Sequence, residues 1–146
     1  MDPLQFLVPL GWIEVVGPVL PFAILVLALA NMATRHLAHA QHVDQAESSD
    51  SVDRYLPHVF TNVGLVLLSS LFTLYQATGG VLLTTFAVTV LIADVFEFEA
   101  RNLEARNDMT IERPKSAIVA SSLVLLYAVY YVLTALNATF WSSLFA

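Results

Sequence analysis

The chain has 146 residues, of which 58% are hydrophobic and 12% charged, and its formal net charge at pH 7 is −6. A soluble helical bundle needs polar helix faces, so charges confined to short stretches between apolar runs exclude an ordinary soluble domain and indicate an all-α, polytopic membrane protein. The absence of cysteine excludes disulfides and thiolate-held zinc or iron–sulfur sites.

The first apolar segment contains Pro18 and Pro21, each of which lacks a backbone donor and either starts a helix or kinks it. If the helix begins at Pro18, residues 1–16 hold a separate interfacial helix on the outer surface. A cleaved signal peptide would carry positive charge before its apolar core. Asp2 and Glu14 precede this one, so we expect a retained anchor.

Four apolar stretches are long enough to cross about 30 Å of hydrocarbon, which takes about 20 helical residues. We expect one membrane domain, 1–146, with four transmembrane helices at about 12–34, 56–78, 81–97 and 116–137. Helical periodicity extends the first to about residue 47 and the third to about residue 107. The uncharged stretch between Arg54 and Asp94 suits two helices, which predicts a helical hairpin turning at Gly79 and Gly80.

All six basic residues lie in two of the stretches between the apolar segments. Loops rich in Lys and Arg stay on the cytoplasmic side of a membrane. We therefore expect a multi-pass protein of the cell membrane in which residues 35–55 and 98–115 are cytoplasmic. The N- and C-termini are then both outside.

The hairpin brings polar and ionisable residues together at membrane depth, where burying a charge costs several kcal/mol. The members of this predicted intramembrane polar layer are His58, Asn62, Asp94, Glu97 and Arg101. A turn at Gly79 and Gly80 would place Asp94 of the third helix beside about Leu65 of the second, and Arg101 beside His58. One interpretation is a proton or cation path or a quinone headgroup site; the other is pairing that holds the hairpin in register. We favour pairing, because the outer half of the third helix offers only threonines.

Histidines at positions 36, 39 and 42 invite a metal or haem hypothesis. Successive members rotate around a helix by about 60°, which strains a shared metal site, so we expect a solvated helix face. No two histidines suit the facing axial positions of a membrane haem. Phosphate loops, catalytic triads and basic aromatic patches are missing as well. We expect no catalytic activity, no cofactor or metal bound by this chain alone, and no nucleic-acid partner.

The fourth helix carries a narrow seam of mostly small residues that suits packing against another helix. Its members alternate by four and three residues: Ala117, Ser121, Val124, Ala128, Tyr131 and Ala135. We expect this helix to contact other membrane subunits.

Acidic residues outnumber basic ones twelve to six, a balance typical of proteins from salt-loving archaea. The run from Leu25 to Arg35, continuing through the three histidines, resembles the first helix of a family of uncharacterised small four-helix membrane proteins of halophilic archaea. This resemblance implies an accessory protein of a cytochrome bc-type complex, with cytochrome b and an iron–sulfur protein as partners. Lipid or quinone would fill grooves at the interfaces with them.

We therefore expect a non-catalytic accessory subunit that packs within a larger respiratory electron-transfer complex. The alternative is a self-assembling small channel or transporter, in which the polar layer around Asp94 and Glu97 lines a pore of the oligomer. Replacement of Asp94 by asparagine separates the two. A pore would lose flux with its assembly intact, whereas a scaffold would lose assembly or show no effect.

Overall fold

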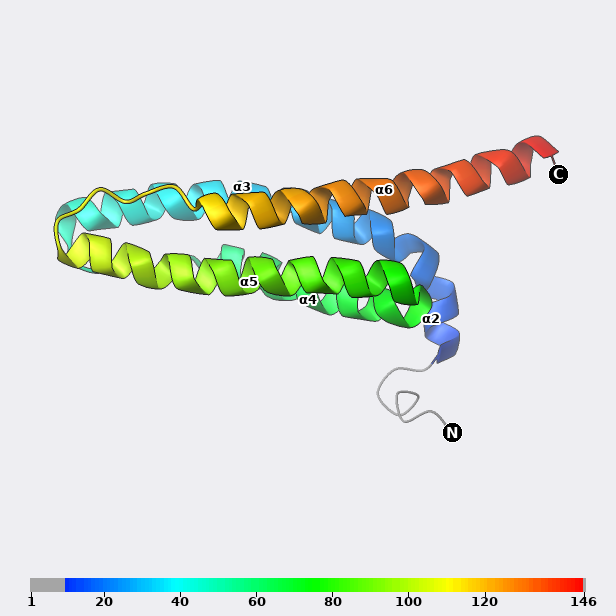
Figure 1. Ribbon diagram of the computed structural model, residues 1–146, viewed down its shortest axis with the longest axis horizontal. Helices are drawn as coiled ribbons and strands as arrows, with labels where there is room; N and C mark the ends of the chain where they lie inside the picture. The colour runs from blue at the N-terminus through cyan, green and yellow to red at the C-terminus, as the bar shows by residue number, and fades with distance from the viewer. Residues whose placement is uncertain (1–9, 146) are drawn as a thin grey trace.

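The computed structural model describes residues 10–145, and these are all-α (Figure 1). In chain order the elements are α2 (Leu10–Val16), the 3-10 helix η1 (Gly17–Val19), α3 (Leu20–Ser48), α4 (Leu56–Tyr75), α5 (Ala77–Arg106) and α6 (Lys115–Phe145). Four segments are long and apolar enough to cross a membrane: Gly11–Ser48, Leu56–Tyr75, Ala77–Arg106 and Lys115–Ala138. The predicted all-α chain with four helices of membrane-spanning length is confirmed.

The four long helices form an antiparallel bundle, as short connections favour. Each packs against the next along the chain, and α6 closes the bundle against α3. Figure 1 shows the α3–α4 loop (residues 49–55) and the α5–α6 loop (residues 107–114) at one end, hereafter the loop end. The α4–α5 turn, α2 and the last turns of α6 lie at the opposite end, hereafter the turn end.

A bend separates α2 from α3 at the prolines. Pro18 lies in η1, and Pro21 lies in the first turn of α3, where a missing backbone donor is tolerated. Beyond the bend, α2 turns across the turn end of the bundle and buries Ile13 (Figure 1). Gly17 packs so closely on the ring of Tyr75 that a side chain there would collide with it. The start of the predicted interfacial helix, residues 1–9, lies outside the described residues.

The hairpin turns at Gln76, and the prediction of a turn at Gly79 and Gly80 is wrong. Gln76 has extended backbone angles, φ −136° and ψ 101°, between the end of α4 and the start of α5. Both glycines lie buried in the first turn of α5. A Cβ on Gly80 would fall on the backbone of Thr73, and one on Gly79 would collide with the ring of Tyr131. The pair therefore permits close helix packing, a second use of glycine besides turns.

The seam of α6 packs inside the chain. Ala117, Ser121, Val124, Ala128 and Tyr131 are all buried, and Ala135 is half-buried. The helices that α6 packs against are α3 and α5. These five residues are therefore covered by the chain itself, whereas the sequence predicted that the seam faces another subunit.

Most of the apolar core lies between the middle of the bundle and its turn end. It consists of Leu20, Ile24, Ala28, Leu65, Phe72, Leu83, Ala87, Val90, Ala120, Val124, Ala128 and Tyr131. A smaller cluster of Val52, Ala105 and Ile111 closes the loop end. Buried polar side chains occupy the space between these two clusters.

Candidate functional site

A buried carboxylate ties three helices together. Asp94 of α5 is 11% exposed, and its Oδ2 accepts from Arg35 Nη2 of α3 at 2.9 Å and lies 3.0 Å from His58 Nε2 of α4. Arg35 Nε donates to Asp94 Oδ1 at 3.4 Å. The guanidinium and the carboxylate form a neutral ion pair in the middle of the bundle, with both carboxylate oxygens engaged.

The fully buried amide of Asn31 continues this network. Its Nδ2 donates to Thr61 Oγ1 at 2.9 Å and to Asn62 Oδ1 at 2.7 Å, and its Oδ1 accepts from Arg35 Nη2 at 2.9 Å. An arginine only donates, so the amide oxygen must be the atom that faces it. Every polar group of the Asn31 side chain is therefore used, and α3 and α4 are joined at the same level as the ion pair.

The ring of His58 bridges the carboxylate of Asp94 on α5 and the hydroxyl of Thr34 on α3. An ionised carboxylate only accepts, so Nε2 donates to Asp94. The other ring nitrogen, Nδ1, lies 2.8 Å from Thr34 Oγ1, which is also 3.0 Å from the carbonyl oxygen of Asn31. Thr34 Oγ1 is also 3.0 Å from Thr61 Oγ1. The ring of His58 therefore links α5 to α3 through its two nitrogens.

The polar layer predicted from the sequence is only partly brought together. Asp94, His58 and Asn62 belong to the network just described. Asp94 faces His58 rather than Leu65, about two helical turns from the expected register, because the hairpin turns at Gln76.

The other two predicted members lie elsewhere. Glu97 is half-buried and accepts from Ser116 Oγ at 3.3 Å, toward the start of α6. Arg101 was expected level with His58, but its Nη1 donates to Nδ1 of His42 on α3 at 2.9 Å. The register was wrong here too, for the same reason.

His42 is a core residue, which corrects the expected solvated face at this position. It is 3% exposed, and its Nε2 lies 2.7 Å from the carbonyl oxygen of Asp53 in the α3–α4 loop. A carbonyl accepts and an arginine donates, so Nε2 carries the proton and Nδ1 is the acceptor. Both bonds need a neutral ring. This histidine fastens the loop to α3 and holds the guanidinium of Arg101.

His36 is exposed and His39 half-buried. Among residues 10–145, no three His, Asp or Glu side chains are grouped so that they could hold a metal ion.

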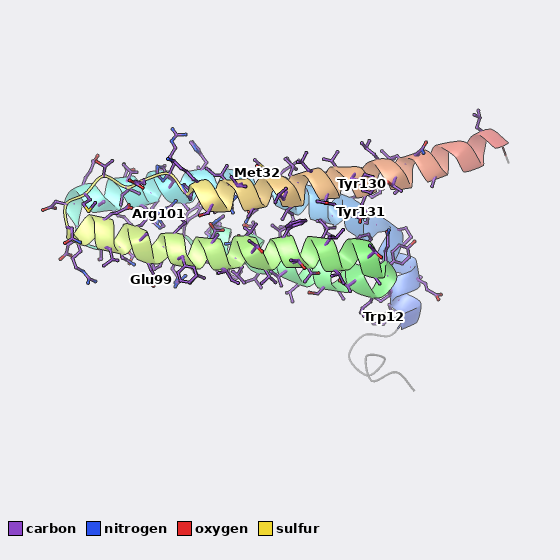
Figure 2. The ribbon with its side chains drawn as sticks, in the orientation of Figure 1. Trp12, Met32, Glu99, Arg101, Tyr130 and Tyr131 are labelled. Atoms are coloured by element: carbon purple, nitrogen blue, oxygen red, sulfur yellow. The ribbon has the colours of Figure 1, made fainter. Side chains whose placement is uncertain are left out.

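A cavity of about 60 Å³ lies between α3, α4 and α5 on the loop side of the ion pair. Its lining is Ala38, His42, Arg54, Tyr55, His58, Val59, Asn62, Leu91, Asp94, Val95, Glu97, Phe98 and Arg101. The guanidinium carbon of Arg54 lies 4.3 Å from the centre of the Phe98 ring, within cation–π range. Figure 2 shows Arg101 between α3 and α5, whereas Glu99 points away from the bundle.

Sequence reasoning missed the polar face of α3. Its buried face runs from Ile24 and Ala28 into Asn31, Arg35 and His42. These positions continue one alternation of three and four residues, and that spacing was the available signal. The sequence interpretation instead treated Arg35 as the flank of a loop, because basic residues usually mark the end of a span.

The comparisons with known proteins bear on the whole chain. No curated protein and no solved structure matches it. Residues 2–145 match a family model described as Domain of unknown function (DUF7313). Since the match covers nearly all of the chain, the protein belongs to the DUF7313 family.

Proposed function

We propose that this protein is a four-span integral membrane protein that serves as a non-catalytic accessory subunit of a larger membrane complex. In this proposal the loop end is cytoplasmic and both termini are outside. The orientation rests on the positions of the six basic residues, because basic loops are retained on the cytoplasmic side. Membrane insertion is supported by the four apolar helices of spanning length.

One observation carries the non-catalytic role: the network of Asn31, Arg35 and Asp94 is satisfied within the chain and lies near the middle of the bundle. Arg35 and Asp94 neutralise each other, and Asn31 has a partner for each of its polar groups. Toward the turn end, Ile24 and Leu65 are among the fully buried apolar side chains that fill the core. A closed network of this kind supports a structural role, because a transport path would need polar groups across the whole thickness.

The kind of complex is proposed from the resemblance to proteins associated with cytochrome bc-type complexes. A subunit without cysteine would leave redox chemistry to partners such as cytochrome b and an iron–sulfur protein. With the α6 seam used internally, the surface offered to partners would be the exposed apolar side chains of the bundle. Phe60 and Phe96 are 72% and 70% exposed, and Leu126 is 64% exposed.

A second candidate, a self-assembling small channel, is favoured by one feature. A shallow groove of about 530 Å³ between α4 and α5 is lined by Ser70, Thr73, Val81, Thr84, Thr85, Val88 and Thr89. In an oligomer this groove would extend a polar path from Asp94 toward the turn end. Against it, the hydroxyls of Ser70, Thr85 and Thr89 bond to carbonyls of their own helices, as buried or lipid-facing hydroxyls commonly do.

Purification of the tagged protein from its native membrane in mild detergent tests the proposal. Mass spectrometry and a visible spectrum of the eluate should show cytochrome b, an iron–sulfur protein and haem absorbance. A colourless oligomer of this chain alone would refute the accessory role. In that case Asp94→Asn should abolish ion flux through reconstituted vesicles without changing the oligomer, while Asp44→Asn, at an exposed carboxylate, should leave flux unchanged.

Single cysteines test the orientation, and the native lack of cysteine removes any background. An impermeant thiol reagent added outside intact cells should label Gln76→Cys in the α4–α5 turn. Ser49→Cys and Asn107→Cys in the two loops should react only after the membrane is opened. Labelling of either loop from outside would reverse the proposed orientation.

A further inference from the structure

Arg101 is a buried cation without a counter-ion. Arg101 is 6% exposed, and its Nε is buried with no hydrogen-bond partner. Its Nη1 donates to the neutral ring of His42. Among residues 10–145 the ion pairs are Arg35–Asp94 and His58–Asp94, so no carboxylate pairs with this guanidinium. Burial of an uncompensated charge is strongly unfavourable, which points to an anion supplied from outside the chain.

The cavity between α3, α4 and α5 has room for such an anion. Both Arg101 and Arg54 line it, and its volume of about 60 Å³ corresponds to about four water positions. A phosphate group is of this size, whereas a whole lipid or a quinone ring with its substituents is larger. Walls formed by Val59, Val95 and Phe98 give the cavity an apolar side next to the two guanidinium groups.

The carboxylates that line the same cavity do not cancel its positive charge. Asp94 is compensated by Arg35, at 2.9 Å. Glu97 leans toward Ser116 on α6 and makes no ion pair among the described residues. Two guanidinium groups then face one uncompensated carboxylate, and the neutral ring of His42 adds no charge. Among the residues that line the cavity the remaining balance is positive; Glu104, one helical turn beyond Arg101, lies near the guanidinium but outside this lining.

The position of the cavity indicates where the anion comes from. Arg101 lies about two helical turns, or about 10 Å, from Asp94 toward the loop end. In the proposed membrane orientation, on which this step rests, that is the level of the cytoplasmic lipid headgroups. Val95 lines the cavity and is partly exposed, and Phe60 and Phe96, which follow the lining residues Val59 and Val95 in the chain, expose apolar side chains that suit acyl chains. Basic pockets between helices on the cytoplasmic side are known binding sites for anionic headgroups.

We propose that the cavity lined by Arg54 and Arg101 binds the phosphate group of an anionic lipid headgroup. The phosphate oxygens accept from the guanidinium of Arg101 where it lines the cavity and supply the missing counter-charge. Arg54, held over the ring of Phe98, contacts the same group from the α3–α4 loop. The lipid thereby joins this loop to α5, next to the Asp53 carbonyl that His42 already holds.

Thermal unfolding of the delipidated, detergent-purified full chain tests this proposal. Short-chain phosphatidylglycerol should raise the melting temperature, whereas phosphatidylcholine at the same concentration should not. Arg101→Gln and Arg54→Gln should each weaken phosphatidylglycerol binding about tenfold or more, because a charge-assisted hydrogen bond is lost. The matched control is Arg106→Gln, which removes an exposed cation of the same helix and should change binding less than twofold.

Several results would overturn the proposal. If phosphatidylcholine raises the melting temperature as much as phosphatidylglycerol does, the site does not distinguish the charge of the headgroup. An equal response to inorganic phosphate at the same concentration refutes a lipid source. A loss confined to Arg113→Gln places the lipid in the second basic cavity, between α3 and α6, where Arg113 and His39 lie.

Two features keep the test independent of other failures. Arg54 is exposed, so Arg54→Gln remains informative even if Arg101→Gln fails to fold. The assay uses the isolated chain, so a failure to find partner subunits in native membranes leaves its outcome unaffected.

Discussion

Replacing Asp94 by asparagine removes the negative charge at the centre of the polar layer and preserves the shape of the side chain. Arg35, which is 4% exposed, is then left as a second buried cation without a counter-ion. Breaking a buried ion pair from one side costs about 3–5 kcal/mol in proteins. The asparagine keeps one oxygen as an acceptor for the guanidinium, so we expect a loss near the lower end, about 3 kcal/mol.

The paired substitution separates the charge effect from the loss of packing. Arg35→Gln together with Asp94→Asn leaves no net charge in the layer and keeps a donor and an acceptor facing each other. The double variant should therefore be more stable than Asp94→Asn alone. A coupling free energy of about 1–3 kcal/mol is the expected size for residues in one hydrogen-bond network.

A buried thiol reports unfolding in this cysteine-free chain. Ser69 is fully buried and its Oγ has no hydrogen-bond partner, so Ser69→Cys adds a near-isosteric reporter to every variant. The free energy of unfolding follows from the rate of thiol labelling in mixed micelles with increasing SDS. Asp44→Asn, which neutralises an exposed carboxylate of α3, is the matched control and should shift stability by less than about 0.5 kcal/mol.

The ion-pair argument is refuted if the free energy of unfolding of Asp94→Asn differs from that of its parent by less than about 1 kcal/mol, which is the effect of an ordinary substitution. It fails equally if the losses from Arg35→Gln and Asp94→Asn simply add. Either result would mean that apolar packing, and not the charge pair, holds α3 against α5 at this level.

Two further substitutions test close packing and loop attachment. Gly80→Ala should destabilise the hairpin by about 1–3 kcal/mol in the same assay, because its Cβ falls on the α4 backbone. Gly11→Ala, which meets nothing within 4 Å, should have no such effect. His42→Phe removes the ring nitrogens that hold the α3–α4 loop, so trypsin should cleave after Arg54 several-fold faster. His36→Phe, at an exposed position of the same helix, should leave that rate unchanged, and equal rates in both variants would contradict the role of His42.

The helices could be predicted because each property that defines them is local. Four apolar runs of sufficient length, bounded by charged stretches, are enough to place helices of spanning length. The proline bend was equally readable, since Pro18 constrains the backbone wherever the chain packs. The ends of the helices beyond the apolar runs followed from periodicity.

Register and partners could not be predicted, because they depend on contacts between segments distant in the chain. A glycine pair suits a turn and a close helix crossing equally well, and only packing on Thr73 decides for the crossing at Gly80. That ambiguity displaced Asp94 by about two turns and paired Arg101 with the wrong histidine. Arg35 was assigned to a loop flank because basic residues usually mark the end of a span, although the spacing of the buried face continues through it.

The ion pair also has a consequence for the order of events during biosynthesis. Arg35 leaves the ribosome in α3 and Asp94 in α5, so two complete helices emerge before the carboxylate exists to neutralise the guanidinium. If the chain inserts as proposed, we expect Arg35 until then to extend its side chain toward the aqueous interface, where it remains solvated. In the proposed membrane orientation we expect a nascent chain stopped at Tyr75 to hold α3 at a shallower depth than the complete chain does. Pairing with Asp94 would then bring α3 to its final depth, so the first three long helices would mature together.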